Sequence, residues 1–164
     1  MDKDLRRGRI FTYGPASDAL DDVNLRVLGE LRDNLRLSMS ELGRRIGMSS
    51  PAVTERVRRL EETGVIRGYQ LEIEPAALGL PLTAYVRVRP NSGQLIRIAE
   101  LAWAIPEVVA CDRVTGEDCF ILKVHLPAID QLDRLLDRFL LYGTTTTSIV
   151  QSSPVPQRPP PLPE

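Results

Sequence analysis

One arginine-rich segment, Ser49–Glu62, carries side chains suited to contact a nucleic acid. Thr54 and Arg58 lie four residues apart and would share one face of a helix. A threonine can contact a thymine methyl group or a base edge, and an arginine can bind guanine or a phosphate. Small residues first and a long arginine later suit a helix that enters the major groove by its N-terminal end. The candidate DNA-contacting residues are Ser38, Arg44, Arg45, Ser49, Ser50, Pro51, Ala52, Thr54, Glu55, Arg58 and Arg59.

The arginines of this region are expected to have different roles. Arg58 is placed to reach a base or a phosphate. Arg44, Arg45, Arg56 and Arg59 suit phosphate contacts, which position a protein on DNA without reading its sequence. Glu55 is spaced to pair with Arg59 and hold it in place.

The charge of the chain is divided unevenly. The 164 residues together carry a net charge of −1. Residues 1–69 have 13 basic and 11 acidic side chains, a net charge of +2, whereas residues 70–164 have 8 and 11, a net charge of −3. Between Arg36 and Tyr69 there are seven arginines and four glutamates. This local basic patch is enough to attract a phosphate backbone, although a solvated helical face would have the same composition.

Few residues could support catalysis or bind a metal ion. The single histidine, His125, falls in the middle of an expected strand without an evident partner, and no base is expected near Cys119. Cys111 and Cys119 form no Cys-x-x-Cys pair, and the sequence has no glycine-rich phosphate loop. We therefore predict no enzyme activity, no cofactor and no metal site, and we expect both cysteines to be buried or half-buried free thiols.

Three amphipathic helices are predicted to hold the arginine-rich segment, within residues 21–34, 38–47 and 49–64. The spacing of Ser38 and Glu41 fits a capping box, and Gly47 is suited to end the second helix. Ser49 is the expected N-cap of the third helix. A capped helix, a short turn that contains glycine and a second capped helix are the layout of a helix-turn-helix. A generic three-helix bundle would show the same pattern.

After residue 64 the hydrophobic pattern becomes alternating. Val65–Ile73 is predicted to form a strand or a two-stranded wing. Residues 74–81 interrupt this pattern and mark the expected domain boundary. The pattern then predicts a strand, a helix, two strands, a helix and a strand, at residues 82–89, 94–105, 108–114, 119–126, 129–141 and 144–152. This βαββαβ order is the ferredoxin-like motif, whose two helices cover one face of an antiparallel sheet. The open face invites pairing with a second copy.

The predicted elements describe an α+β protein in five segments. They are a flexible N-terminal arm at 1–19, a winged helix-turn-helix at 20–67, a linker strand and hinge at 68–81, a ferredoxin-like domain at 82–153 and a proline-rich tail at 154–164. The tail holds six prolines and is not expected to enter a core. Neither an apolar run of about 20 residues nor a secretion signal is recognisable, so we expect a cytoplasmic protein without a membrane partner.

The sequence resembles the leucine-responsive and asparagine-regulator (Lrp/AsnC) family of bacterial transcription factors over about residues 20–155. The resemblance rests on Leu20-Asp21 and Val27-Leu28, on the segment E-R-V-R-R-L-E-x-x-G-V-I-x-G-Y at 55–69, and on Val114–Asp118. It implies a winged helix-turn-helix that binds promoter DNA and a ferredoxin-like domain that senses a small molecule, typically an amino acid. It also implies homodimers that assemble into tetramers or octamers on the nucleoid.

The resemblance places the effector pocket near the turn between the second and third strands of the C-terminal domain. The residues of this turn are Thr115, Gly116, Glu117, Asp118 and Cys119. Backbone N–H groups beside Gly116 could bind a carboxylate, and Asp118 could accept an ammonium group. The residue types alone also fit a plain hairpin. Many relatives have an aspartate at the position of Cys119, so their effectors do not transfer directly to this chain. Many also have an aspartate at the position of Asn24, where the difference affects only capping and local charge.

A second function class stays open at this level. An amino-acid-binding oligomeric module that acts on a protein partner would have the same C-terminal half, with a vestigial DNA-binding domain. The basic patch and the helix caps favour the DNA-binding regulator.

Overall fold

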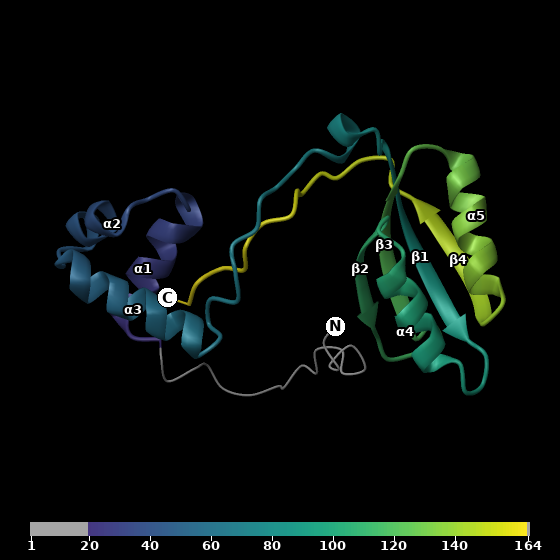
Figure 1. The fold of residues 1–164 in the computed structure, drawn as a ribbon, viewed down its shortest axis with the longest axis horizontal. Helices are drawn as coiled ribbons and strands as arrows, with labels where there is room; N and C mark the ends of the chain where they lie inside the picture. The colour runs from purple at the N-terminus through teal and green to yellow at the C-terminus, as the bar shows by residue number, and fades with distance from the viewer. Residues whose placement is uncertain (1–19, 164) are drawn as a thin grey trace. The chain divides into compact units, whose positions relative to one another are not determined.

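The structure is a computed structural model that describes residues 20–163 and divides the chain into two compact units (Figure 1). The N-terminal unit comprises residues 20–72 together with 156–163, and the C-terminal unit comprises residues 73–155. The predicted arm at 1–19 and the terminal Glu164 lie outside the described residues. Each unit is described by itself below.

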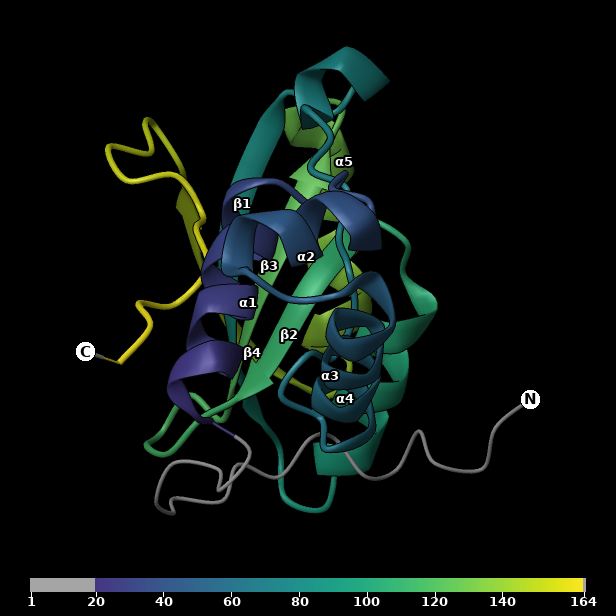
Figure 2. The ribbon, with the colours of Figure 1, turned by 90° about the vertical axis from the view of Figure 1, so that its left-hand side faces the viewer.

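Three helices form the N-terminal unit: α1 (Asp22–Asp33), α2 (Met39–Ile46) and α3 (Ser50–Glu62). The side chain of Asp21 caps α1 and that of Ser38 caps α2, by accepting from the N–H groups of Asn24 and Glu41. Gly47 ends α2 in the left-handed conformation, with φ of 76°. The short turn between α2 and α3 therefore has the predicted helix-turn-helix geometry (Figure 2).

The predicted N-cap of α3 is wrong in one respect. Ser49 occupies the N-cap position, but its side chain makes no capping hydrogen bond. Pro51 lies in the first turn of α3 and has no N–H group. The turn therefore has one fewer N–H group for a capping side chain to accept from. The hydroxyl of Thr54 instead donates to the carbonyl oxygen of Ser50 at 2.8 Å.

The three helices enclose one apolar core. Its fully or nearly fully buried residues come from all three helices: Val27, Leu31, Leu42, Ile46, Val53, Val57 and Leu60. The pattern that predicted these inward faces is confirmed. The remaining sides of α2 and α3 are therefore free to carry exposed polar residues.

The strand predicted at Val65–Ile73 is not formed. No strand is assigned within the described residues before β1, and a 3₁₀ helix (Pro75–Leu78) follows instead. Alternation alone does not make a strand, because the backbone N–H and C=O groups also need a partner strand. Leu71 and Ile73 stay largely exposed, at 76% and 51%.

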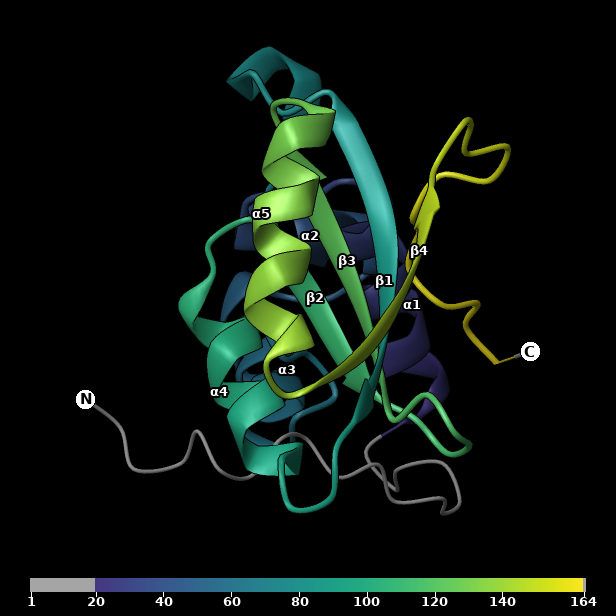
Figure 3. The ribbon, with the colours of Figure 1, turned by 90° about the vertical axis from the view of Figure 1, so that its right-hand side faces the viewer.

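The C-terminal unit has the predicted βαββαβ order. Its elements are β1 (Leu82–Pro90), α4 (Leu95–Ala104), β2 (Val108–Arg113), β3 (Phe120–Leu126), α5 (Ile129–Leu140) and β4 (Gly143–Ile149). All strand pairs are antiparallel, and the strand order is β2-β3-β1-β4. Both helices lie on one face of the sheet (Figure 3), where Ile98 and Phe139 pack with Val86.

The opposite face of the sheet is open in this single chain. Alternate residues of β1, such as Tyr85 and Arg87, are exposed there. β2 is an edge strand, and five of its six residues are exposed. Cys111 is one of them, so the prediction of a buried or half-buried thiol is wrong for Cys111 and confirmed for the half-buried Cys119. Both thiols are free.

No helix among residues 20–163 is long and apolar enough to cross a bilayer.

The core of the C-terminal unit yields a stability test. Phe139→Ala removes a ring that is fully buried, so we expect a loss of about 3–5 kcal/mol in the free energy of unfolding. Leu141→Ala is the matched control, because Leu141 is 74% exposed and its loss should change stability by less than about 0.5 kcal/mol. Urea unfolding followed by far-UV circular dichroism would measure both, and equal losses would contradict this core.

Candidate nucleic-acid and effector sites

The structure places all eleven predicted DNA-contacting residues where solvent can reach them. Ser50 and Ala52 are half-buried at the start of α3, and the other nine are exposed. Thr54, Glu55 and Arg58 follow one another along the outer side of α3, because its inner side is filled by the core. This exposed side begins at the N-terminal end of the helix, which is the end that contacts bases in helix-turn-helix proteins.

Arg58 is held by carboxylates on its own helix. Its Nε and one terminal nitrogen donate to the two oxygens of Glu55 at 2.9 and 2.5 Å, and its other terminal nitrogen bonds Glu62. The pairing lowers the pKa of Glu55 and raises the pKa of Arg58. The predicted Glu55–Arg59 pair is wrong: at three residues' spacing, Arg58 reaches both carboxylate oxygens at once.

Arg44 and Arg45 share a single carboxylate. Glu41 accepts from Arg44 at 2.6 Å and from Arg45 at 3.1 Å, and Arg45 also bonds Glu30 at 2.9 Å. These bonds lower the pKa of Glu41. The capping box at Ser38 is thus only half formed, because the carboxylate of Glu41 turns toward the arginines. Exposed pairs of this kind are weak, so a phosphate can take the place of the carboxylate.

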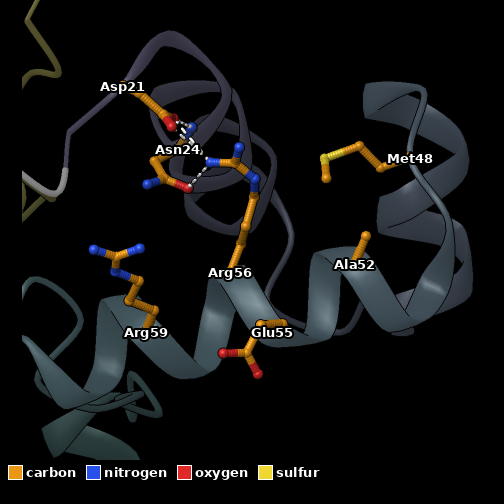
Figure 4. Close-up of a pocket in the computed structure, with 7 residues that line it drawn as sticks. All are labelled: Asp21, Asn24, Met48, Ala52, Glu55, Arg56 and Arg59. Carbon is orange, nitrogen blue, oxygen red and sulfur yellow. Dashed lines mark hydrogen bonds and ion pairs between the residues drawn. The ribbon is translucent and has the colours of Figure 1, made fainter.

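Arg56 has a structural role in place of the expected phosphate contact. Its guanidinium donates to both oxygens of Asp21, at 3.0 and 2.7 Å, and to the side-chain oxygen of Asn24 at 2.9 Å (Figure 4). Asn24 is only 7% exposed, and the pairing lowers the pKa of Asp21. Asp21 also caps α1, so this cluster joins the start of α1 to the middle of α3.

An open hollow lies beside this cluster. Figure 4 shows Arg59 on the same side of α3 as Arg56. The residues that line the hollow are Asp21, Asn24, Met48, Ala52, Glu55, Arg56 and Arg59. Two arginines line the hollow. Because Arg56 is bonded to Asp21, Arg59 is the one that can turn outward to a phosphate.

Sequence reasoning missed Gly43 and misassigned Arg56. A Cβ on Gly43 would lie 2.6 Å from the carbonyl oxygen of Met48, so only glycine lets the turn fold back this closely on α2. A buried glycine inside a predicted helix was the available signal. No local signal could reveal the role of Arg56, because Arg56 and Asp21 are 35 residues apart.

The predicted effector residues form the connection between β2 and β3. The N–H of Val114 donates to the carbonyl oxygen of Cys119 at 2.9 Å and closes the loop over Thr115–Asp118. Gly116 has φ of 109°, a conformation that glycine adopts without strain. The thiol of Cys119 lies 4.0 Å from the carbonyl oxygen of Gly116.

Two arginines of β1 approach this loop. Arg89 bonds Glu117, and its Nε lies 3.9 Å from a carboxylate oxygen of Asp118. Arg87 lies 3.9 Å from the other oxygen of Asp118. The loop therefore offers paired guanidinium and carboxylate groups, which together match the two charges of an amino acid. Sequence reasoning did not identify Arg87 and Arg89 as site residues.

His125 does have a partner, contrary to the sequence-based expectation. Its Nδ1 lies 2.9 Å from the hydroxyl oxygen of Thr83 on the neighbouring strand. Among residues 20–163, no group of three or more His, Cys, Asp or Glu is arranged to hold a metal ion.

Comparison with known proteins identifies both units. A winged helix-turn-helix DNA-binding model matches residues 20–67, and the Lrp/AsnC ligand binding domain matches residues 83–160. The chain belongs to the Lrp/AsnC family. The HTH-type transcriptional regulator LrpC of Bacillus subtilis is 35% identical over 133 residues, which cover 81% of this chain and 92% of LrpC. The regulator LrpA of Mycobacterium tuberculosis is 38% identical and covers 74% of this chain and 82% of its own length.

Solved Lrp/AsnC structures agree with the fold. B. subtilis LrpC superposes with a TM-score of 0.79 at 33% identity, over 84% of this chain and 99% of LrpC. The regulator NMB0573 of Neisseria meningitidis, solved as a complex with L-Met, superposes with a TM-score of 0.76 at 26% identity, over 85% and 94%. This Lrp/AsnC chain is a DNA-binding transcriptional regulator and not an enzyme, as the sequence predicted.

The Arg56–Asp21 pair makes the helix-turn-helix sensitive to acid. Since the folded-state pKa of Asp21 lies below its ordinary value of 3.8, the pair stabilises the fold above that value. This contribution is lost as the pH falls through the lowered pKa. We expect Asp21→Asn to accelerate hydrogen exchange of the α1 amides at pH 6, and we expect the difference from the parent protein to shrink as the pH is lowered below 3.8. A difference that stays constant over this pH range would contradict this role.

Proposed function

We propose that this Lrp/AsnC regulator reads its operator with the outer side of α3. The observation that carries the proposal is Arg58, which is exposed on α3 and bonded to Glu55 and Glu62 on the same helix. Thr54 lies one turn before it and supplies a methyl group to a thymine or a hydroxyl to a base edge. Arg44, Arg45 and Arg59 bind phosphates, and Ser38, Ser49, Ser50, Pro51 and Ala52 line the close approach to the backbone and groove.

In this proposal the protein acts as a homodimer that assembles further into a tetramer or octamer. The exposed face of the four-stranded sheet supports self-pairing, because it leaves residues such as Tyr85 and Ile121 without a covering layer in the single chain. Two symmetry-related copies of α3 then require a roughly palindromic operator. The protein works in the cytoplasm, on the nucleoid.

The effector is an amino acid bound at the loop Thr115–Cys119. Its carboxylate binds the guanidinium of Arg89 or the N–H groups beside Gly116, and its ammonium group binds the carboxylate of Asp118. NMB0573, which shares the fold, was solved with L-Met, and this supports an amino acid as the class of effector.

Arg58→Ala tests base reading. If Arg58 reads a base, affinity for DNA from upstream of its own gene should fall roughly 10- to 100-fold, while affinity for a scrambled duplex changes little. Fluorescence anisotropy over a salt series would measure both. Arg134→Ala, on α5, is the matched control and should leave both affinities unchanged. Equal losses on the two duplexes would assign Arg58 to a phosphate instead.

The same assay addresses the alternative function. A parent protein that binds amino acids but has equal affinity for the two duplexes would favour the module that acts on a protein partner. Tight binding to the native fragment, at a salt concentration that releases the scrambled one, would favour the regulator.

Asp118→Asn tests the effector site. Removing the charge that accepts the ammonium group should weaken amino-acid binding roughly 10-fold. Isothermal titration calorimetry would begin with L-methionine and continue through the other amino acids. Asp133→Asn, an exposed carboxylate on α5, should bind normally. If binding is unchanged in Asp118→Asn, the site lies elsewhere.

A further inference from the structure

The proline-rich end of the chain belongs to the N-terminal unit. Residues from Pro156 onward group with α1, α2 and α3, although they follow the last strand of the C-terminal unit. Leu162 is half-buried, whereas every other described residue from 151 to 163 is exposed. One apolar side chain of the tail is therefore packed against a surface, and Val155, at 64% exposure, is not.

The surface that Leu162 meets is α1. A Cβ on Gly29 would lie 3.8 Å from Cδ1 of Leu162, which is ordinary van der Waals contact. Gly29 is two residues from both Val27 and Leu31, the core residues of α1, so it faces away from the core. Glycine is a poor helix former in the middle of a helix, and here it leaves space beside α1. Figure 1 shows the end of the tail beside α1.

Prolines reduce the entropic cost of docking. Pro159, Pro160, Pro161 and Pro163 flank Leu162 and fix the backbone angle φ at each of their positions. A proline-rich segment is already extended before it binds, so few conformations are lost when it docks. A single leucine contact can then hold a segment that would otherwise stay in solution.

We propose that residues 156–163 form a strap that docks on the outer side of α1 in the same subunit through Leu162. Within residues 20–163 the chain passes from one unit to the other near residue 72 and again near residue 155, so the docked strap adds a noncovalent tether to the covalent linker. The strap continues from β4, an edge strand of the effector domain. A displacement of β4 would pull on α1, and α1 is tied to the recognition helix by Arg56 and Asp21.

Cross-linking tests the docking and the subunit that receives it. In a full-length protein with Cys111 and Cys119 replaced by serine, Asp33→Cys, one helical turn beyond Gly29, and Pro163→Cys, beside Leu162, should be joined by a short bismaleimide within one chain, giving a monomer with the mass of one linker. A mixture of the two single-cysteine variants should give no cross-linked dimer. A dimer in the mixture would overturn docking within a subunit, and no cross-link in either sample would overturn docking altogether.

Hydrogen exchange tests the contact without cysteines. Leu162→Ser should speed exchange of the α1 amides about fivefold, whereas Val155→Ser, the matched control, should leave them unchanged. Equal exchange in Leu162→Ser and the parent protein would overturn the proposal.

The effect on DNA rests on the proposed function. Leu162→Ser should weaken operator binding about threefold without changing its salt dependence, because the variant keeps Arg158 and loses no phosphate contact. A parent protein that does not prefer its operator would defeat the proposed function, while cross-linking and exchange would still decide the docking. Unchanged operator affinity in Leu162→Ser would overturn the coupling of the strap to the recognition helix.

Discussion

The orientation of the recognition helix depends on one half-buried guanidinium. Arg56 projects from the middle of α3 and bonds Asp21 and Asn24 at the start of α1. Just before the start of α3, the carbonyl oxygen of Met48 packs against Gly43 of α2. Any residue with a Cβ atom at position 43 would clash with this oxygen. These two constraints fix α3 at its beginning and its middle. Together with the buried Val53, Val57 and Leu60, they set the direction of the exposed row from Thr54 to Arg58.

Three exposed arginines of the helix-turn-helix form ion pairs within the free protein. Arg58 pairs with Glu55 and Glu62, and Arg44 and Arg45 share Glu41. Each pair is exposed and therefore weak, so DNA phosphates or bases can displace the carboxylates. In the proposed complex, the released carboxylates would face the DNA and would lower the affinity for any sequence whose contacts do not offset their displacement. A chain with a net charge of −1 can in this way bind a polyanion selectively.

Local chemistry determined which parts of this structure the sequence could predict. Caps at Asp21, Ser38 and Gly47 act within a few residues of where they stand, and periodicity marked the inward faces of all five helices and the order of the strands. The errors came from partners distant in sequence. Alternation at Val65–Ile73 suggested a strand but could not show whether a partner strand exists. Asp21 and Arg56 are 35 positions apart, so no local pattern revealed their ion pair. Even the choice between Arg58 and Arg59 as partner of Glu55 depended on side-chain reach that spacing alone does not settle.

The loop between β2 and β3 shows how a charge pair can couple ligand binding to a sheet. Asp118 lies 3.9 Å from both Arg87 and Arg89, which stand on β1 at the centre of the sheet, with β4 as its neighbour. Ion pairs at this distance are weak, and the carboxylate and ammonium groups of an amino acid can bind Arg89 and Asp118 at shorter distances. An amino acid that takes Arg89 and Asp118 would separate the loop from β1 and alter the open face of the same strand. Since β1 pairs with β4 over Ala84–Pro90, a movement of β1 would also move β4, the strand that precedes the C-terminal strap.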